Sequence, residues 1–151
     1  MGRRVIFTSS SAEETFSFGK NLGETAPPGS LFALFGDLGA GKTTLIKGIV
    51  FGATGTSPES IVSPTYMYLR SIPSTKKNNI SAYHFDLYRL RSNEDFFSLG
   101  FDEYLNDESS ICCIEWSERI SPSLPDNHIP LYLSHVDGSR RKIEGVIPWL
   151  P

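Results

Sequence analysis

The stretch Gly36-Asp37-Leu38-Gly39-Ala40-Gly41-Lys42-Thr43 follows the apolar run Leu31-Phe32-Ala33-Leu34-Phe35 and matches the pattern G-x-x-x-x-G-K-[ST]. The apolar run is typical of a strand that is covered on both faces, as in a parallel sheet. After the pattern, Thr43 to Val50 carries apolar residues at helical spacing. A strand, a glycine-rich turn and a helix in this order predict an α/β layer structure with a phosphate-binding loop between the strand and the helix.

The chemistry of phosphate binding explains each residue type in this loop. Glycines let successive backbone N–H groups converge on an anion, and the start of the following helix adds the positive end of its dipole. Lys42 supplies a mobile charge for the β- and γ-phosphates of a nucleoside triphosphate, and the Thr43 hydroxyl can ligate Mg²⁺. Together these features favour phosphate binding over a turn that only connects a strand to a helix. The predicted nucleotide-binding residues of the loop are Gly36, Asp37, Leu38, Gly39, Ala40, Gly41, Lys42, Thr43 and Thr44.

Length and composition indicate an ordinary globular protein. The 151 residues fit a single domain, and the formal net charge of −3 gives no support to a broad nucleic-acid-coating surface, although a small local patch is compatible with it. No apolar stretch approaches the roughly 18 residues that span a bilayer, and the N-terminus lacks the apolar core of a secretory signal. Cys112 and Cys113 are adjacent within an apolar run, which favours two buried reduced thiols over a disulfide. We therefore expect a cytoplasmic protein without a membrane partner.

The remaining pattern predicts further elements of the fold. A strand is expected at Val5 to Phe7, and Ser11 with Glu14 has capping-box spacing for a helix that reaches about Leu22 and stops at Gly23. The sequence also predicts strands at Tyr83 to Leu87 and Ile111 to Ile114, a helix capped at Ser92 that ends near Gly100, and a C-terminal antiparallel hairpin of Leu131 to Val136 and Arg140 to Ile147.

Two acidic residues could complete a phosphate site. Asp86 lies in the predicted strand Tyr83 to Leu87, and Glu115 directly follows Ile111 to Ile114. Because α/β sheets bind ligands at the carboxyl ends of their strands, both carboxylates could act on a metal ion or its water. The alternatives are a surface carboxylate for Glu115, and a helix cap or a salt-bridge partner of Arg89 or Arg91 for Asp86.

Three other features lie near these candidates in the sequence. Ser63-Pro64-Thr65-Tyr66 could present two hydroxyls from an ordered loop, although such a tetrapeptide read alone is more typical of a plain turn. Trp116 could exclude water from the phosphates, stack on a partner or pack in the core. His84 is interpreted as a packed or hydrogen-bonded strand histidine rather than a base.

These segments together resemble one family, the TsaE (YjeE) P-loop ATPases of bacterial tRNA threonylcarbamoyladenosine synthesis. The resemblance rests on the phosphate loop through Thr44, on Ser63-Pro64-Thr65-Tyr66, on His84-Phe85-Asp86-Leu87-Tyr88-Arg89-Leu90 and on Glu115-Trp116, in the order and spacing of the family. The resemblance covers most of the chain up to about Arg119. The run from His84 to Leu90 and the Glu115-Trp116 pair make it specific. Ser117 stands where a proline commonly follows the tryptophan.

The resemblance implies a three-layer P-loop NTPase fold whose mainly parallel sheet has antiparallel additions. It implies weak Mg²⁺-dependent ATP hydrolysis, with Thr43 and Glu115 on the metal, Lys42 and Asp86 at the reacting phosphate, Thr65 in a nucleotide-sensing loop and Trp116 beside the phosphates. It also implies TsaB and TsaD as partners. ATP turnover would reset the complex with these proteins, and tRNA would be reached indirectly through that complex. Arg140 and the N-terminal helix are loose candidates for contacts to the base.

Three other functions are compatible with a phosphate loop. A small-molecule kinase would need an acceptor pocket and usually an arginine-bearing lid; Arg89 and Arg91 could serve in it, but no lid segment is evident. A GTP-dependent switch would need the Asn-Lys-x-Asp segment that reads guanine, which the sequence lacks. A scaffold that uses bound nucleotide only for assembly would not need Asp86 or Glu115 for turnover.

Overall fold

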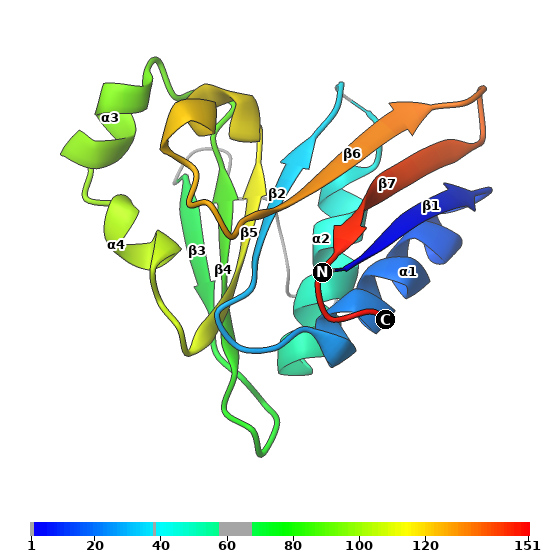
Figure 1. Ribbon diagram of the computed structural model, residues 1–151, viewed down its shortest axis with the longest axis horizontal. Helices are drawn as coiled ribbons and strands as arrows, with labels where there is room; N and C mark the ends of the chain where they lie inside the picture. Colours follow the sequence, from blue (N-terminus) through cyan, green and yellow to red (C-terminus); the bar gives the residue numbers. More distant parts are fainter. Residues whose placement is uncertain (1, 38, 58–67) are drawn as a thin grey trace.

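The computed structural model describes residues 2–37, 39–57 and 68–151, and their helices and strands form three layers (Figure 1). In chain order, the elements are β1 (Arg3–Ser9), α1 (Ala12–Thr25), β2 (Leu31–Phe35), α2 (Lys42–Thr54), β3 (Leu69–Ile72), β4 (Ser81–Asp86), α3 (Asn93–Ser98), α4 (Asp102–Leu105), β5 (Ser110–Glu115), the 3₁₀ segment η2 (Ser117–Ser123), β6 (Ile129–His135) and β7 (Arg141–Ile147). Every strand and helix that the sequence predicts is present.

The seven strands form one mixed sheet in the order β1-β7-β6-β2-β5-β4-β3. The four central strands β6, β2, β5 and β4 run parallel, whereas β7, β1 and β3 are antiparallel additions at the two edges. The predicted C-terminal hairpin is confirmed as β6 and β7, and it continues the central sheet because β6 pairs with β2. Because β2, β5 and β4 run parallel, their carboxyl ends lie side by side along the same edge of the sheet, the edge where these strands end.

Helices cover both faces of the sheet. α1 and α2 pack on one face, where side chains such as Phe32 and Leu34 of β2 join Ile46 and Ile49 of α2 in a core cluster. On the other face, Leu31 and Ala33 of the same strand pack with side chains of α3, α4 and η2 in a second cluster. The alternation also separates the adjacent cysteines, since Cys113 belongs to the first cluster and Cys112 to the second. Both are free and buried, as predicted.

Helix α1 begins where the sequence predicts and ends later. The Ser11 hydroxyl accepts a hydrogen bond from the Glu14 amide (3.1 Å), and the Glu14 carboxylate accepts one from the Ser10 amide (2.9 Å). The predicted stop at Gly23 was wrong, because α1 continues to Thr25. Gly23 lies inside the helix at its contact with α2, where the lack of a side chain serves close packing rather than termination.

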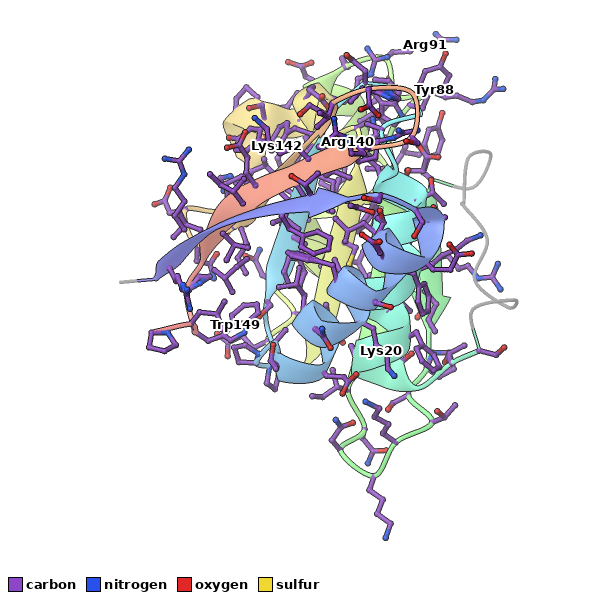
Figure 2. The ribbon with its side chains drawn as sticks, turned by 90° about the vertical axis from the view of Figure 1, so that its right-hand side faces the viewer. Lys20, Tyr88, Arg91, Arg140, Lys142 and Trp149 are labelled. Atoms are coloured by element: carbon purple, nitrogen blue, oxygen red, sulfur yellow. The ribbon has the colours of Figure 1, made fainter. Side chains whose placement is uncertain are left out.

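Four glycines bring α1 and α2 together along their length (Figure 2, where Lys20 marks α1). Gly19 and Gly23 of α1 face the backbone of α2, and Gly48 and Gly52 of α2 face the backbone of α1. A Cβ atom at any of them would meet a backbone oxygen of the opposite helix closer than 3.0 Å, a distance that real Cβ atoms essentially never show. The contact fixes the start of α1 beside the start of α2.

Among the helices of the described residues, none combines the length and the apolar character that a membrane span requires.

Candidate functional site

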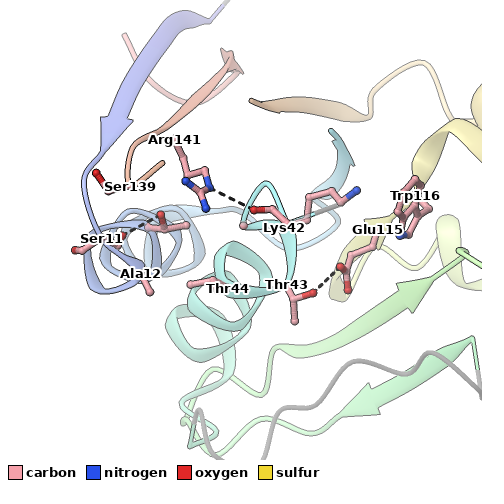
Figure 3. Close-up of a pocket in the computed structure, with 12 residues that line it drawn as sticks. Ser11, Ala12, Lys42, Thr43, Thr44, Glu115, Trp116, Ser139 and Arg141 are labelled. Atoms are coloured by element: carbon pink, nitrogen blue, oxygen red, sulfur yellow. Dashed lines mark hydrogen bonds between the residues drawn. The ribbon is translucent and has the colours of Figure 1, made fainter. Parts of the chain in front are cut away.

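A cavity of about 350 Å³ lies where α2 begins and β5 ends (Figure 3). Its walls come from segments that are far apart in the sequence: the start of α1, the phosphate loop, the end of β5 and the turn before β7. The lining residues are Ser11, Ala12, Thr15, Gly39, Gly41, Lys42, Thr43, Thr44, Glu115, Trp116, Ser139 and Arg141. The fold therefore gathers most of the predicted loop and both Glu115 and Trp116 around one cavity.

The phosphate loop has the backbone that its glycines allow. Gly39 (φ 79°) and Gly41 (φ 95°) adopt left-handed conformations, in which a side chain would be strained. The Ala40 amide donates to the Asp37 carbonyl (3.1 Å), which closes the turn, and Gly41 caps the first turn of α2. The helix start thus directs its unpaired amides toward the cavity, as anion binding requires. Leu38 lies outside the described residues.

Lys42 is the first residue of α2 and is buried despite its charge. Its Nζ donates to the carbonyl oxygen of Gly36 and lies 3.7 Å from the centroid of the Trp116 ring. Burial lowers the pKa of Lys42, and the nearby carboxylates of Glu118, Glu115, Asp37 and Asp86 oppose this shift in decreasing order. A bound polyphosphate would add negative charge beside a desolvated ammonium, which favours the charged lysine.

Thr43 and Glu115 join the phosphate loop to the end of β5. The Thr43 hydroxyl donates to Oε1 of Glu115 (2.7 Å), as the dashed line in Figure 3 shows. The other carboxylate oxygen of Glu115, Oε2, lies 2.7 Å from Nε2 of His84 on β4. Glu115 is only 4% exposed, so it is not a surface carboxylate.

Asp86 ends β4 and lies directly opposite Glu115 in the parallel register of β4 and β5. It is buried, and its Oδ1 accepts a hydrogen bond from the Tyr88 amide (3.0 Å). Asp86 thus caps the turn that follows its strand while it lies at the same sheet edge as the phosphate loop. Asp86 therefore has a local capping role and also lies beside the candidate site.

Trp116 combines two of its predicted environments. Its ring is half-buried, lines the cavity over Lys42 and packs against Tyr88 with the ring centroids 5.0 Å apart. Its backbone is left-handed (φ 59°), which costs a residue other than glycine about 1–3 kcal/mol. The sharp bend begins η2 immediately after β5 and so brings Glu118 to the loop, where its Oε2 lies 3.4 Å from the Gly36 amide.

Several site residues gave no signal in the sequence. Glu118 reaches the loop only because of the bend at Trp116. Arg141 lines the cavity, and its Nε donates to the Gly39 carbonyl (3.3 Å), whereas the expected Arg140 pairs with Asp137 in the hairpin turn. The N-terminal helix, the other loose candidate for base contacts, does line the cavity through Ser11, Ala12 and Thr15. Ser63-Pro64-Thr65-Tyr66, including the predicted site residue Thr65, lies outside the described residues.

The oxygen atoms of the site suit Mg²⁺. Magnesium prefers oxygen ligands, keeps several waters and takes one or two carboxylates together with substrate phosphates. The Thr43 hydroxyl and a Glu115 carboxylate oxygen are already within 2.7 Å of each other at the start of α2, with Asp86 on the neighbouring strand. This donor set is compatible with a magnesium ion that a nucleotide shares.

Known proteins resemble this chain over most of its length. Residues 9–143 match the family model described as Threonylcarbamoyl adenosine biosynthesis protein TsaE. The chain is 40% identical over 136 residues to a Rickettsia conorii protein named tRNA threonylcarbamoyladenosine biosynthesis protein TsaE, and this match covers 90% of the chain and 74% of the relative. Proteins of the same name from Nostoc (41% identical, covering 87% of the chain and 79% of the relative) and Bacillus subtilis (32%, covering 87% and 78%) are also similar.

The fold has a solved counterpart. The crystal structure of Bacillus subtilis YdiB superposes with a TM-score of 0.75 and 28% sequence identity, covering 97% of this chain and 86% of that one. The predicted α/β fold of the P-loop NTPases is thereby confirmed. The family model, the relatives and the fold agree, and the chain belongs to the TsaE family of threonylcarbamoyl adenosine biosynthesis proteins.

Proposed function

We propose that this protein binds ATP with Mg²⁺ on the loop Gly36 to Thr44 and hydrolyses it slowly, as an accessory protein of tRNA threonylcarbamoyladenosine synthesis. The observation that carries the proposal is the junction of the phosphate loop with the end of β5. There Lys42, Thr43 and Glu115 line one cavity, and Thr43 and Glu115 are hydrogen-bonded at 2.7 Å. A glycine-rich loop that served only as a connection would not need a buried lysine and a buried carboxylate beside it.

The residues divide the work by their chemistry. The backbone amides of the loop and the start of α2 bind the phosphates, and Lys42 leaves the Gly36 carbonyl to pair with the β- and γ-phosphate oxygens. Thr43 and Glu115 would hold the magnesium ion, whose charge would offset that of the phosphates. Trp116 shields Lys42 and the phosphates from bulk water, which strengthens their electrostatic interactions.

Hydrolysis needs a water in line with the γ-phosphate. Asp86 lies at the same sheet edge as Glu115, so its carboxylate can accept a hydrogen bond from this water and orient it. The water oxygen forms a bond to phosphorus as the bond to the β–γ bridging oxygen breaks, and the products are ADP and inorganic phosphate.

The partners follow from the family. Relatives named for tRNA threonylcarbamoyladenosine biosynthesis cover most of this chain. We therefore propose that ATP turnover resets a complex with TsaB and TsaD between rounds of tRNA modification, that tRNA is reached through this complex and that the cycle runs in the cytoplasm. Transfer of the threonylcarbamoyl group belongs to the partners.

The test is phosphate release from ATP without any added acceptor, by the chain alone and with TsaB and TsaD. We expect Mg²⁺-dependent release that falls about 100-fold or more in Asp86→Ala and in Glu115→Ala, the scale of losing a group that stabilises the transition state. Glu103→Ala is a matched control, since Glu103 is an exposed carboxylate on α4 outside the cavity. Unchanged turnover in both acidic variants would favour a nucleotide-dependent scaffold. Release that requires a metabolite acceptor would favour a small-molecule kinase.

A further inference from the structure

His84 is a polar residue in the middle of the sheet with no exposure to solvent. It lies on β4 between Arg70 of β3 and Cys113 of β5 in the strand register. Its side chain shares a sheet face with the buried apolar residues Ala82 and Cys113, two positions and one strand away. An apolar side chain could fill this position, so packing alone does not explain a histidine here.

The one side-chain hydrogen bond that His84 makes among the described residues is directed at the candidate site. Its Nε2 lies 2.7 Å from Oε2 of Glu115, and the opposite oxygen of that carboxylate accepts from Thr43 at 2.7 Å. Glu115 is therefore held from two sides, by the phosphate loop and by the interior of the sheet. Of these two bonds, the one from Thr43 involves the carboxylate oxygen that a metal ion would take.

The second ring nitrogen fixes the direction of this bond. Nδ1 of His84 is buried, and no hydrogen-bond partner for it exists among the residues that the structure describes. A proton on Nδ1 would be a buried donor without an acceptor, which is costly. The favoured tautomer therefore carries its proton on Nε2 and donates it to Glu115.

We infer that His84 is a positioning residue, which holds Oε2 of Glu115 so that Oε1 stays directed at Thr43 and at the metal of a bound nucleotide. The inference rests on the proposed function, in which Glu115 is a ligand of the metal ion. If Thr43 and Glu115 turned these oxygens to a metal ion, the His84 bond to Oε2 would remain and would keep the carboxylate in its orientation. Without His84, Glu115 would lose its interior donor and could turn away from the loop.

The experiment separates the donor from the volume of the side chain. His84→Gln retains an N–H donor at a similar reach, and His84→Met has a similar length without a donor. Cys113→Ala is the packing control, because Cys113 is the buried neighbour of His84 on β5 and makes no bond to Glu115. For each protein, calorimetry gives the dissociation constant of the non-hydrolysable analogue adenylyl imidodiphosphate with Mg²⁺ and with EDTA, and thermal unfolding shows that the variant is folded.

The readout is the factor by which Mg²⁺ tightens nucleotide binding. In His84→Met we expect this factor to fall about 10-fold or more, the usual loss when a group that orients a metal ligand is removed, while binding in EDTA stays within about 2-fold. His84→Gln should keep the factor within about 3-fold of the wild type, since it keeps the donor, and Cys113→Ala should leave it unchanged.

Two results would overturn the inference about His84. One is a wild-type factor in His84→Met. The other is an equal loss in His84→Gln, His84→Met and Cys113→Ala, which would reduce His84 to packing. A wild-type protein that does not bind the analogue, or binds it equally with Mg²⁺ and EDTA, would instead overturn the proposed function itself.

Discussion

Replacing Gly23 by alanine should push α1 and α2 apart and destabilise the protein. An alanine Cβ at this position would meet the Ile49 carbonyl oxygen and would lie 2.9 Å from the Ala53 amide nitrogen. Both are backbone atoms of a helix, so no side chain can turn away to relieve the contact. The helices would have to separate, and this separation would also move the start of α1 away from Lys42 and Thr43.

The cost of this change follows from two opposing effects. Overpacking costs up to about 3 kcal/mol, and the upper value applies here because the atoms contacted are backbone. Alanine is a better helix former than glycine by about 1 kcal/mol, which offsets part of the loss and leaves about 2 kcal/mol. For a chain of 151 residues, 1 kcal/mol shifts the melting temperature by about 2–4 °C, so we expect a decrease of about 4–8 °C.

Thermal unfolding followed by circular dichroism measures this decrease. The control is Gly138→Ala in the turn between β6 and β7, where a Cβ would meet no atom within 4 Å, and its melting temperature should stay within about 2 °C of the wild type. Calorimetry should also show weaker nucleotide binding by Gly23→Ala, because the cavity has walls from both helices. A melting temperature of Gly23→Ala equal to that of Gly138→Ala would show that the close helix contact does not limit the side chain at this position.

Three further changes test other parts of the molecule. Lys42→Met keeps the length of the side chain and removes its charge, and we expect affinity for the triphosphate analogue to fall about 10- to 100-fold, as for a lost hydrogen bond to a charged group; unchanged affinity would exclude Lys42 from the phosphate site. Trp116→Gly and Trp116→Ala both remove the ring over Lys42 and its packing on Tyr88, so nucleotide affinity should fall in both. Glycine also relieves the left-handed backbone, so the melting temperature of Trp116→Gly should exceed that of Trp116→Ala; equal melting temperatures would show that the backbone at this position carries no strain. Asp107 accepts hydrogen bonds from Ser109, Tyr83 and Ser110, and the bonds from Ser109 contribute most to lowering its pKa from 3.8. Its stabilisation is therefore present above pH 3.8 and is lost as the pH falls through the lowered pKa. Because solvent screens this carboxylate, Asp107→Asn should reduce the free energy of unfolding by less than about 1 kcal/mol at pH 7 and by less again at pH 3, as urea denaturation at both values would measure.

Local patterns in the sequence predicted most elements of this fold, because each predicted element has a local cause, but they did not predict β3, α4 or η2. The run Leu31 to Phe35 is apolar on both faces because both faces are covered, and the Ser11–Glu14 pair caps α1 as its spacing indicates. The end of α1 could not be read in the same way. Gly23 has the same signal as a helix terminator, and only the approach of α2 shows that it is a packing residue.

The candidate site was predictable as far as its residues lie in sequence patterns or at strand ends. Asp86 and Glu115 could be found because β4 and β5 end at the same edge of a parallel sheet. Arg141 and Glu118 could not, because their approach to the loop depends on the β6–β7 turn and on the backbone of Trp116. The bond between His84 and Glu115 depends on the pairing of two strands that are separated by 23 residues in the sequence, from 87 to 109.

A crystal structure of the protein with adenylyl imidodiphosphate and Mn²⁺ would test the assignment of the site most directly, because manganese gives an anomalous signal that locates the metal. We expect the phosphates on the amides of the loop Gly36 to Thr44, with the metal bound to the Thr43 hydroxyl at about 2.1–2.2 Å, near the value for magnesium, and the Glu115 carboxylate in contact with it or with one of its waters. Phosphates outside this loop, or a metal held without Thr43 and Glu115, would mean that the cavity at the end of β5 is not the nucleotide site.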